Sequence, residues 1–137
     1  MPHGSEASTG SKATCISAVW RLVDECSNTS WDGYGARSIS AETGGRAENF
    51  ILTLPDGVPV PELSPEPDGS ISLDWIESPD RILSLSVGTT DRLAYAWVNG
   101  TDRGHAVDQF DGDRTPARII EGIRAVTSRG HAAIGTS

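Results

Sequence analysis

The 137-residue sequence is poor in the residues that build metal, redox or disulfide sites. Its two cysteines, Cys15 and Cys26, lie in a segment whose pattern predicts one helix. In a helix they are about 16 Å apart along the axis, which is too far for a disulfide. The three histidines are scattered, and no HxH, HExxH or CxxC spacing occurs. We therefore expect no disulfide, no metal site and no cofactor.

Familiar catalytic motifs are also missing. The sequence has no G-x-S-x-G elbow and no Walker loop. Gly33 and Gly35 are not followed by the third glycine of a dinucleotide-binding fingerprint. These absences favour a non-enzymatic protein.

Long apolar runs and positive charge are scarce. No stretch approaches the roughly 18 apolar residues of a membrane span, and the first residues lack the features of a secretory signal. Lys and Arg number 11 against 19 Asp and Glu, a net charge of −8. A protein that binds phosphate backbones has the opposite balance. We expect a cytoplasmic protein that binds neither nucleic acid nor a membrane.

Composition divides the chain into one domain and two tails. Residues 1–11 and 130–137 are rich in small residues without periodicity, so we predict disordered N-terminal and C-terminal tails. Residues 12–129 form one predicted domain, and the hydrophobic content of 36% over the whole chain is adequate for a single core.

Three segments have the apolar periodicity of amphipathic helices. They are residues 12–26, 40–54 and 115–130. Ser40 and Thr115 are the predicted N-caps of the second and third helices, the latter because Pro116 follows it. Gly44 and Gly45 put the first turn of the second helix in doubt, since each glycine costs about 1 kcal/mol relative to alanine.

Between the second and third helices the sequence alternates apolar and polar residues, as strands do. The predicted strands cover residues 71–76, 83–87, 93–97 and 106–110, and a proline-rich segment precedes them. Each strand has a face of large residues and a face of small polar ones, which is typical of a sheet covered on one side. We predict an α+β fold: an antiparallel meander of four to five strands with about three helices, mainly packed on one face.

Negative charge is concentrated in the middle of the chain. Residues 47–80 contain no Lys or Arg, and the rest of the chain carries 11 charges of each sign, because 8 of the 19 acidic residues lie in this segment. These eight are Glu48, Asp56, Glu62, Glu66, Asp68, Asp74, Glu77 and Asp80. The simpler interpretation of these acidic residues is that they keep the protein soluble. The alternative is a basic protein partner, bound as an inhibitor of the immunity or antitoxin type binds its target.

The glycine-rich segment 31–36 is the candidate recognition loop. Acidic residues beside turns usually cap backbone donors, and large aromatics usually pack in the core. The loop is a binding element if Trp31 or Tyr34 projects beside Asp32, and a structural corner if both aromatics are buried. The predicted binding residues are Trp31, Asp32, Tyr34, Glu62, Glu66, Asp68, Asp74 and Trp75.

Two further hypotheses remain open. A small hydrolase or ligand-binding enzyme would use Asp32 and Asp74 as catalytic carboxylates, about 10 Å apart or less in a concave pocket lined by aromatic residues. A homodimer would use the exposed face of the sheet.

Several short blocks occur in a distinctive order. They are W-D-G-Y-G-A at 31–36, Leu54-Pro55, P-E-P-D-G at 65–69, S-L-D-W at 72–75 and L-A-Y-A at 93–96. With these blocks, the chain resembles a family of short bacterial proteins over roughly residues 16 to 126. In that family a W-D-G-Y-G-A loop precedes a helix, and a P-E-P-D-G turn introduces a strand. The resemblance implies no particular activity, cofactor or partner. Gly44 and Gly45 depart from the helix-forming residues expected there.

Overall fold

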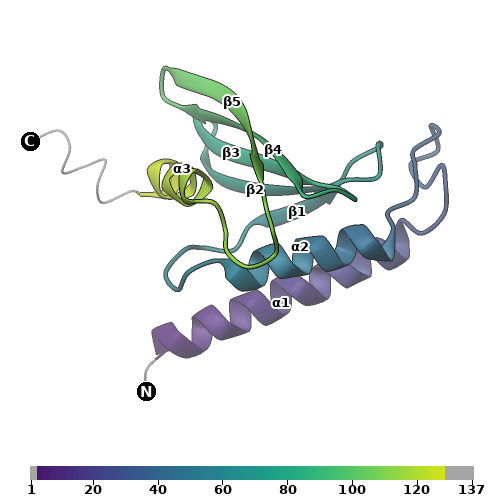
Figure 1. The fold of residues 1–137 in the computed structure, drawn as a ribbon, viewed down its shortest axis with the longest axis horizontal. Helices are drawn as coiled ribbons and strands as arrows, with labels where there is room; N and C mark the ends of the chain where they lie inside the picture. The colour runs from purple at the N-terminus through teal and green to yellow at the C-terminus, as the bar shows by residue number, and fades with distance from the viewer. Residues whose placement is uncertain (1–2, 129–137) are drawn as a thin grey trace, which may run out of the picture.

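The computed structural model describes residues 3–128. Three helices and five strands follow one another in the order α1, α2, β1 to β5, α3 (Figure 1). Their bounds are α1 His3–Glu25, α2 Ala41–Thr53, β1 Glu62–Pro65, β2 Ile71–Ser78, β3 Arg81–Val87, β4 Arg92–Asn99, β5 Asp102–Gln109 and α3 Ala117–Thr127.

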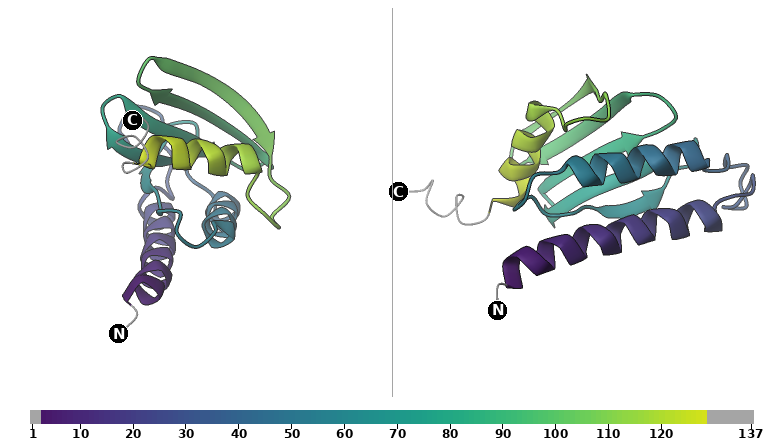
Figure 2. Two further views of the ribbon diagram at one scale, coloured as in Figure 1. Left: turned by 90° about the vertical axis from the view of Figure 1, so that its left-hand side faces the viewer. Right: turned by 60° about the horizontal axis from the view of Figure 1, so that its bottom comes forward.

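The strands form one antiparallel sheet in the order β1-β2-β3-β4-β5, so every strand pairs with its neighbour in sequence. Figure 2 shows α2 and α3 on the same side of this sheet, with α1 running beside α2. The predicted α+β meander, with helices mainly on one face, is therefore confirmed.

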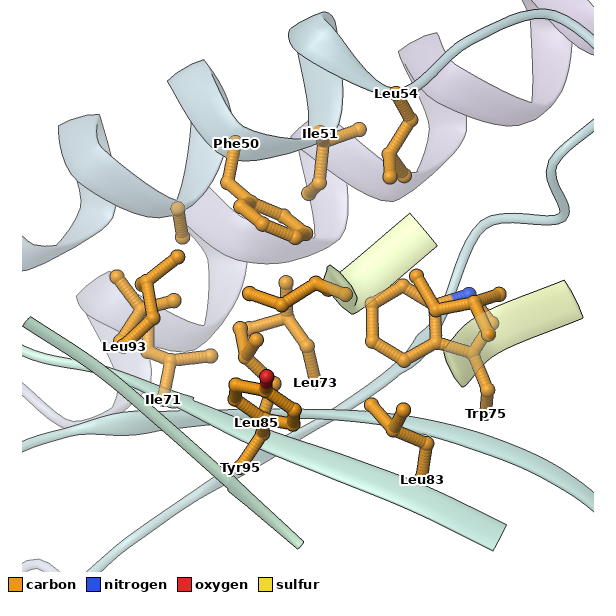
Figure 3. Packing of buried hydrophobic residues seen from close by; sticks show 14 of the residues in the cluster. Phe50, Ile51, Leu54, Ile71, Leu73, Trp75, Leu83, Leu85, Leu93 and Tyr95 are labelled. Carbon is orange, nitrogen blue, oxygen red and sulfur yellow. The ribbon is translucent and has the colours of Figure 1, made fainter. Parts of the chain in front are cut away.

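The alternation of side chains along each strand separates a core face from an open face. Large apolar residues of β2, β3 and β4 point toward the helices and are buried, among them Ile71, Leu73, Leu83, Leu85 and Leu93 (Figure 3). Phe50 of α2 lies at the centre of this core, with edge-to-face contacts to Trp75 and Phe110 at centroid distances of 6.3 and 5.6 Å. Burial of these apolar faces provides the main stabilisation of the fold.

The start of α2 follows the prediction, whereas that of α3 does not. Ser40 caps α2, since its Oγ accepts a hydrogen bond from the Thr43 amide at 3.2 Å. Thr115 does not cap α3: the N-cap is Pro116, without a side-chain cap, and the Thr115 hydroxyl is 2.6 Å from that of Thr53. A hydroxyl that is buried against another hydroxyl satisfies its hydrogen bond there, which explains the error.

Other boundaries also differ from expectation. Helix α1 begins at His3 rather than at residue 12, so helix occupies most of the segment predicted as an N-terminal tail. The predicted C-terminal tail, 130–137, lies outside the described residues. Strand β5 begins at Asp102, paired with Asn99, because a tight turn with Gly100 at φ 67° replaces the expected longer loop. Strand β1 falls in the proline-rich segment, where an edge position tolerates Pro65.

A buried tyrosine links the last two strands of the sheet. The Tyr95 hydroxyl donates a hydrogen bond to Asp108 Oδ2 at 2.8 Å, and Arg118 of α3 lies 3.8 Å from the other oxygen of this carboxylate. Burial, followed by the hydrogen bond and the negative charge of Asp108, raises the pKa of Tyr95 to about 12, with Arg118 opposing the shift. The folded protein therefore holds this proton at a pH where the unfolded chain has lost it.

This difference predicts a loss of stability at high pH. The contribution of Tyr95 is fully present below about pH 10 and is lost as the pH rises toward 12. Between pH values of about 9 and 11.5, we expect urea unfolding to show a decline in the free energy of unfolding that is about 2 kcal/mol larger for the wild type than for Tyr95→Phe. Equal declines in the two proteins would contradict the raised pKa of Tyr95.

Candidate functional site

The loop at 31–36 is fixed by its own side chains. Asp32 Oδ1 accepts hydrogen bonds from the backbone amides of Tyr34 at 2.8 Å and Ala36 at 3.1 Å. Gly33 and Gly35 have φ angles of 82° and 86°, a region that side chains other than glycine rarely adopt. Trp31 packs partly against the core and donates its indole N–H to the Arg37 carbonyl at 2.7 Å. Trp31 and Asp32 thus hold the loop in shape.

Tyr34 projects from this loop into solvent. Its side chain is 91% exposed, more than any other large hydrophobic residue with a described side chain. Tyrosine combines an aromatic face with a hydroxyl and has few rotatable bonds, which makes it a frequent anchor of protein interfaces. Trp31 is partly buried and Tyr34 projects beside Asp32, so the loop meets the condition stated above for a binding element.

The P-E-P-D-G turn lies directly against this loop, although the two are far apart in the sequence. The Arg37 amide donates a hydrogen bond to the Pro67 carbonyl at 2.8 Å. A Cβ at Gly69 would lie 3.1 Å from the Ser38 carbonyl oxygen, and Gly69 has φ 93°. Glycine therefore allows both the turn and its close approach to the loop. We call residues 31–37 and 65–70 together the loop–turn surface.

The acidic residues of the turn have different roles. Asp68 Oδ1 accepts a hydrogen bond from the Ser70 amide at 2.9 Å and so caps the turn. Glu66 reaches onto the open face of the sheet, where its Oε1 accepts a hydrogen bond from Ser86 Oγ at 2.6 Å. The loop–turn surface is therefore continuous with the acidic side of the open face.

Two more predicted binding residues lie on that acidic side. Glu62 of β1 is paired in register with Asp74 of β2, and the Asp74 carboxylate accepts a hydrogen bond from Ser72 Oγ at 2.7 Å. Trp75, the next residue, points the opposite way, is 2% exposed and donates its indole N–H to the Pro59 carbonyl. The prediction of Trp75 as a binding residue is therefore wrong, because strand alternation places it in the core.

The eight acidic residues of segment 47–80 do not form one patch. Glu48 lies on α2 and accepts the indole N–H of Trp20 from α1, and Asp56 lies in the connection between α2 and β1. Those near the loop–turn surface are Glu62, Glu66, Asp68 and Asp74. The acidic neighbourhood is thus smaller than the sequence implied.

Arg118 of α3 and Arg81 of β3 interact away from the loop–turn surface. Arg118 faces Asp108, and Arg81 donates to the carbonyls of Ala125 and Ser128 at the end of α3. Two ion pairs join Arg46 to Glu42 and Arg118 to Asp108, and neither of these two involves an acidic residue of the loop–turn surface.

The two concavities described among residues 11–128 lie away from Asp32 and Asp74. One concavity, of about 540 Å³, lies between α2 and the segment 110–112, and another, of about 650 Å³, lies between α1 and β1. Neither of these two concavities is lined by Asp32 or Asp74. Asp32 instead caps the loop, as the simpler interpretation of acidic residues beside turns predicts.

Both cysteines are buried, and burial raises the pKa of the Cys15 thiol to about 11, which disfavours the reactive thiolate. Within the described residues, no group of three or more His, Cys, Asp and Glu side chains is placed to hold a metal ion. Among residues 3–128, no helix has the length and apolar character needed to cross a bilayer.

Sequence reasoning missed the basic residues on the open face. Arg92, Arg103 and His105 point away from the helices and are exposed on β4 and β5. If the alternation of apolar and polar residues in β4 is continued through a tight turn into the next strand, these three residues fall on the polar face of the sheet.

Comparison with protein-family models, with curated proteins and with solved structures found no match.

Proposed function

We propose that the protein is a non-enzymatic binding module that holds a basic protein partner on its loop–turn surface. The observation that carries this proposal is the 91% exposure of Tyr34 on a loop whose backbone is fixed by Asp32. A tyrosine presented by a fixed loop loses little conformational entropy on binding, so that most of the energy of its contacts contributes to affinity.

Charge supports a basic partner rather than an acidic one. Glu66 and Asp68 flank the tyrosine loop, and their hydrogen bonds to Ser86 and to the Ser70 amide leave oxygen lone pairs for further donors. Lys and Arg side chains of a partner would complement these carboxylates, and the net charge of −8 would speed its association. A role of the immunity or antitoxin type, in which an acidic protein covers a basic one, fits this combination.

The proposal predicts a large effect of Tyr34→Ala on affinity. Proteins are captured from an extract of the native host at about 0.1 M salt, and the captured basic protein is purified for titration. We expect Tyr34→Ala to weaken its binding by about 30-fold, as removal of a central aromatic anchor does. Leu52→Ala is the matched control, because Leu52 is 52% exposed at the far end of α2.

A pair of charge-matched variants separates local from overall electrostatics. Glu66→Gln and Asp56→Asn remove one negative charge each, the first at the loop–turn surface and the second away from it. We expect Glu66→Gln to weaken binding by about tenfold and Asp56→Asn to leave it nearly unchanged. Failure of the wild type to retain any basic protein, or equal binding by wild type and Tyr34→Ala, would overturn the proposal.

A further inference from the structure

The open face of the sheet has short side chains at its centre and an apolar row at one end. The short side chains are those of Ser64, Ser72, Ser84, Ser86, Ala94 and Ala96. The apolar row consists of Ile76, Ile82 and Val98, which are paired in register on β2, β3 and β4. Ile76 of this row is 50% exposed. Val107 of β5, which is paired with Ala94 and lies outside the row, is 44% exposed. Such a face can approach another flat surface closely.

Charge divides this face into two halves of opposite sign. One cross-strand row runs in register through Glu62, Asp74, Ser84, Ala96 and His105. The β1–β2 side of the sheet therefore carries two carboxylates, whereas the carboxylate of Glu66 reaches Ser86 of the central strand β3. The β4–β5 side carries exposed basic side chains, those of Arg92, Arg103 and His105. The face is complementary in charge to a second copy of itself.

We propose that the open face is the interface of a symmetric dimer whose two-fold axis runs parallel to the strands. Rotation about that axis places β1 over β5 of the partner, β2 over β4 of the partner and β3 over β3 of the partner. Each cross-strand row then faces the same row of the partner. Glu62 then faces the partner's basic side, and Ile82 faces the partner's Ile82, so that acidic meets basic and apolar meets apolar.

The charges select this axis over the alternative. A two-fold axis across the strands would place β1 over β1 and the acidic half over the acidic half, which is repulsive. In the proposed dimer both loop–turn surfaces lie at the same end of the strands, so they could engage a partner together. The inference does not depend on the proposed function, since Tyr34→Ala tests the loop and substitutions on the strands test the open face, whereas Glu66 belongs to both surfaces.

The size of the face predicts a weak, salt-sensitive dimer. Five strands about 4.8 Å apart and six rows about 3.4 Å apart give a flat area on the order of 500 Å² per copy, below the roughly 800 Å² of a standard interface. We therefore expect a concentration-dependent equilibrium at about 0.1 M salt that shifts toward monomer at about 1 M salt, where charges are screened.

Sedimentation equilibrium on two charge-reversal variants tests the pairing. Glu62→Lys with Asp74→Lys replaces the carboxylates of β1 and β2 by basic side chains and leaves Glu66 acidic on this face. Arg103→Glu with His105→Glu replaces two basic side chains of β5 by carboxylates and leaves Arg92 of β4 basic. We expect each variant alone to dimerise at least about tenfold more weakly than the wild type, and an equimolar mixture to recover association as a heterodimer. Recovery in the mixture also shows that both variants are folded.

Two control measurements complete the test. Ile82→Asp, at the predicted axis, should abolish the dimer, whereas Leu52→Ala on α2 should leave it unchanged. A wild type that stays monomeric up to about 500 µM at low salt, a concentration at which weak interfaces assemble, would overturn the proposal. Charge reversals without effect, or a mixture that associates no better than its components, would overturn it as well.

Discussion

Replacing Phe50 by alanine is expected to lower the free energy of unfolding by about 3–5 kcal/mol, the range found when a buried aromatic is truncated. Phe50 is fully buried and contacts the rings of Trp75 and Phe110, so it joins α2 to the sheet and to the segment that leads into α3. The truncation removes apolar contacts on both sides and leaves a cavity that the surrounding strands cannot fill. Equilibrium urea unfolding, followed by tryptophan fluorescence, measures the change.

Leu52→Ala is the control for this experiment because it shortens a side chain of the same helix outside the core. Leu52 is 52% exposed, and alanine is at least as good a helix former, so the expected change is below about 0.5 kcal/mol. Similar losses for both variants would mean that α2 contributes through its helical structure alone and that Phe50 does not organise the core.

The two adjacent glycines of α2 should respond to alanine in opposite directions. A Cβ at Gly44 would lie 2.8 Å from Val23 Cγ2 and 2.9 Å from Trp20 Cζ3, so Gly44 allows α1 to approach α2. A Cβ at Gly45 would meet no atom within 4 Å. We expect Gly44→Ala to cost about 1–3 kcal/mol through overpacking and Gly45→Ala to gain about 0.5–1 kcal/mol through reduced chain entropy.

Thermal and urea unfolding of both variants, with the double variant as a check on additivity, provides the measurement. Because both substitutions change helix propensity by the same amount, their difference isolates the contact with α1. Stabilisation of similar size by both substitutions would show that α1 does not pack closely at Gly44.

The sheet could be predicted from sequence because its pattern is local. In β2, β3 and β4 large residues such as Leu73, Leu85 and Tyr95 alternate with Ser and Ala, and a covered sheet is the simplest way to bury one set alone. Helix ends were predicted less well, because Thr115 satisfies its hydroxyl with the distant Thr53, which no local pattern reveals.

The candidate site was predictable in its residues but not in its geometry. The sequence singled out Tyr34, Glu66 and Asp68, yet their proximity depends on the hydrogen bond from Arg37 to Pro67, which joins segments about 30 positions apart. Trp75 and Asp74 are neighbours in sequence but lie on opposite faces of the sheet. The two-residue period of a β-strand alone predicts that two consecutive residues such as these point to opposite faces of the sheet.

Photo-crosslinking from position 34 in the native host tests the proposed binding role most directly. A benzoyl-phenylalanine replaces Tyr34 in one protein and Leu52 in a second, so that the exposed loop site before α2 is compared with an exposed site near the C-terminal end of α2. We predict that irradiation links a basic protein to the chain substituted at position 34 and not to the chain substituted at position 52. Absence of an adduct at position 34, or the same adducts from both positions, would contradict a partner bound on the loop–turn surface.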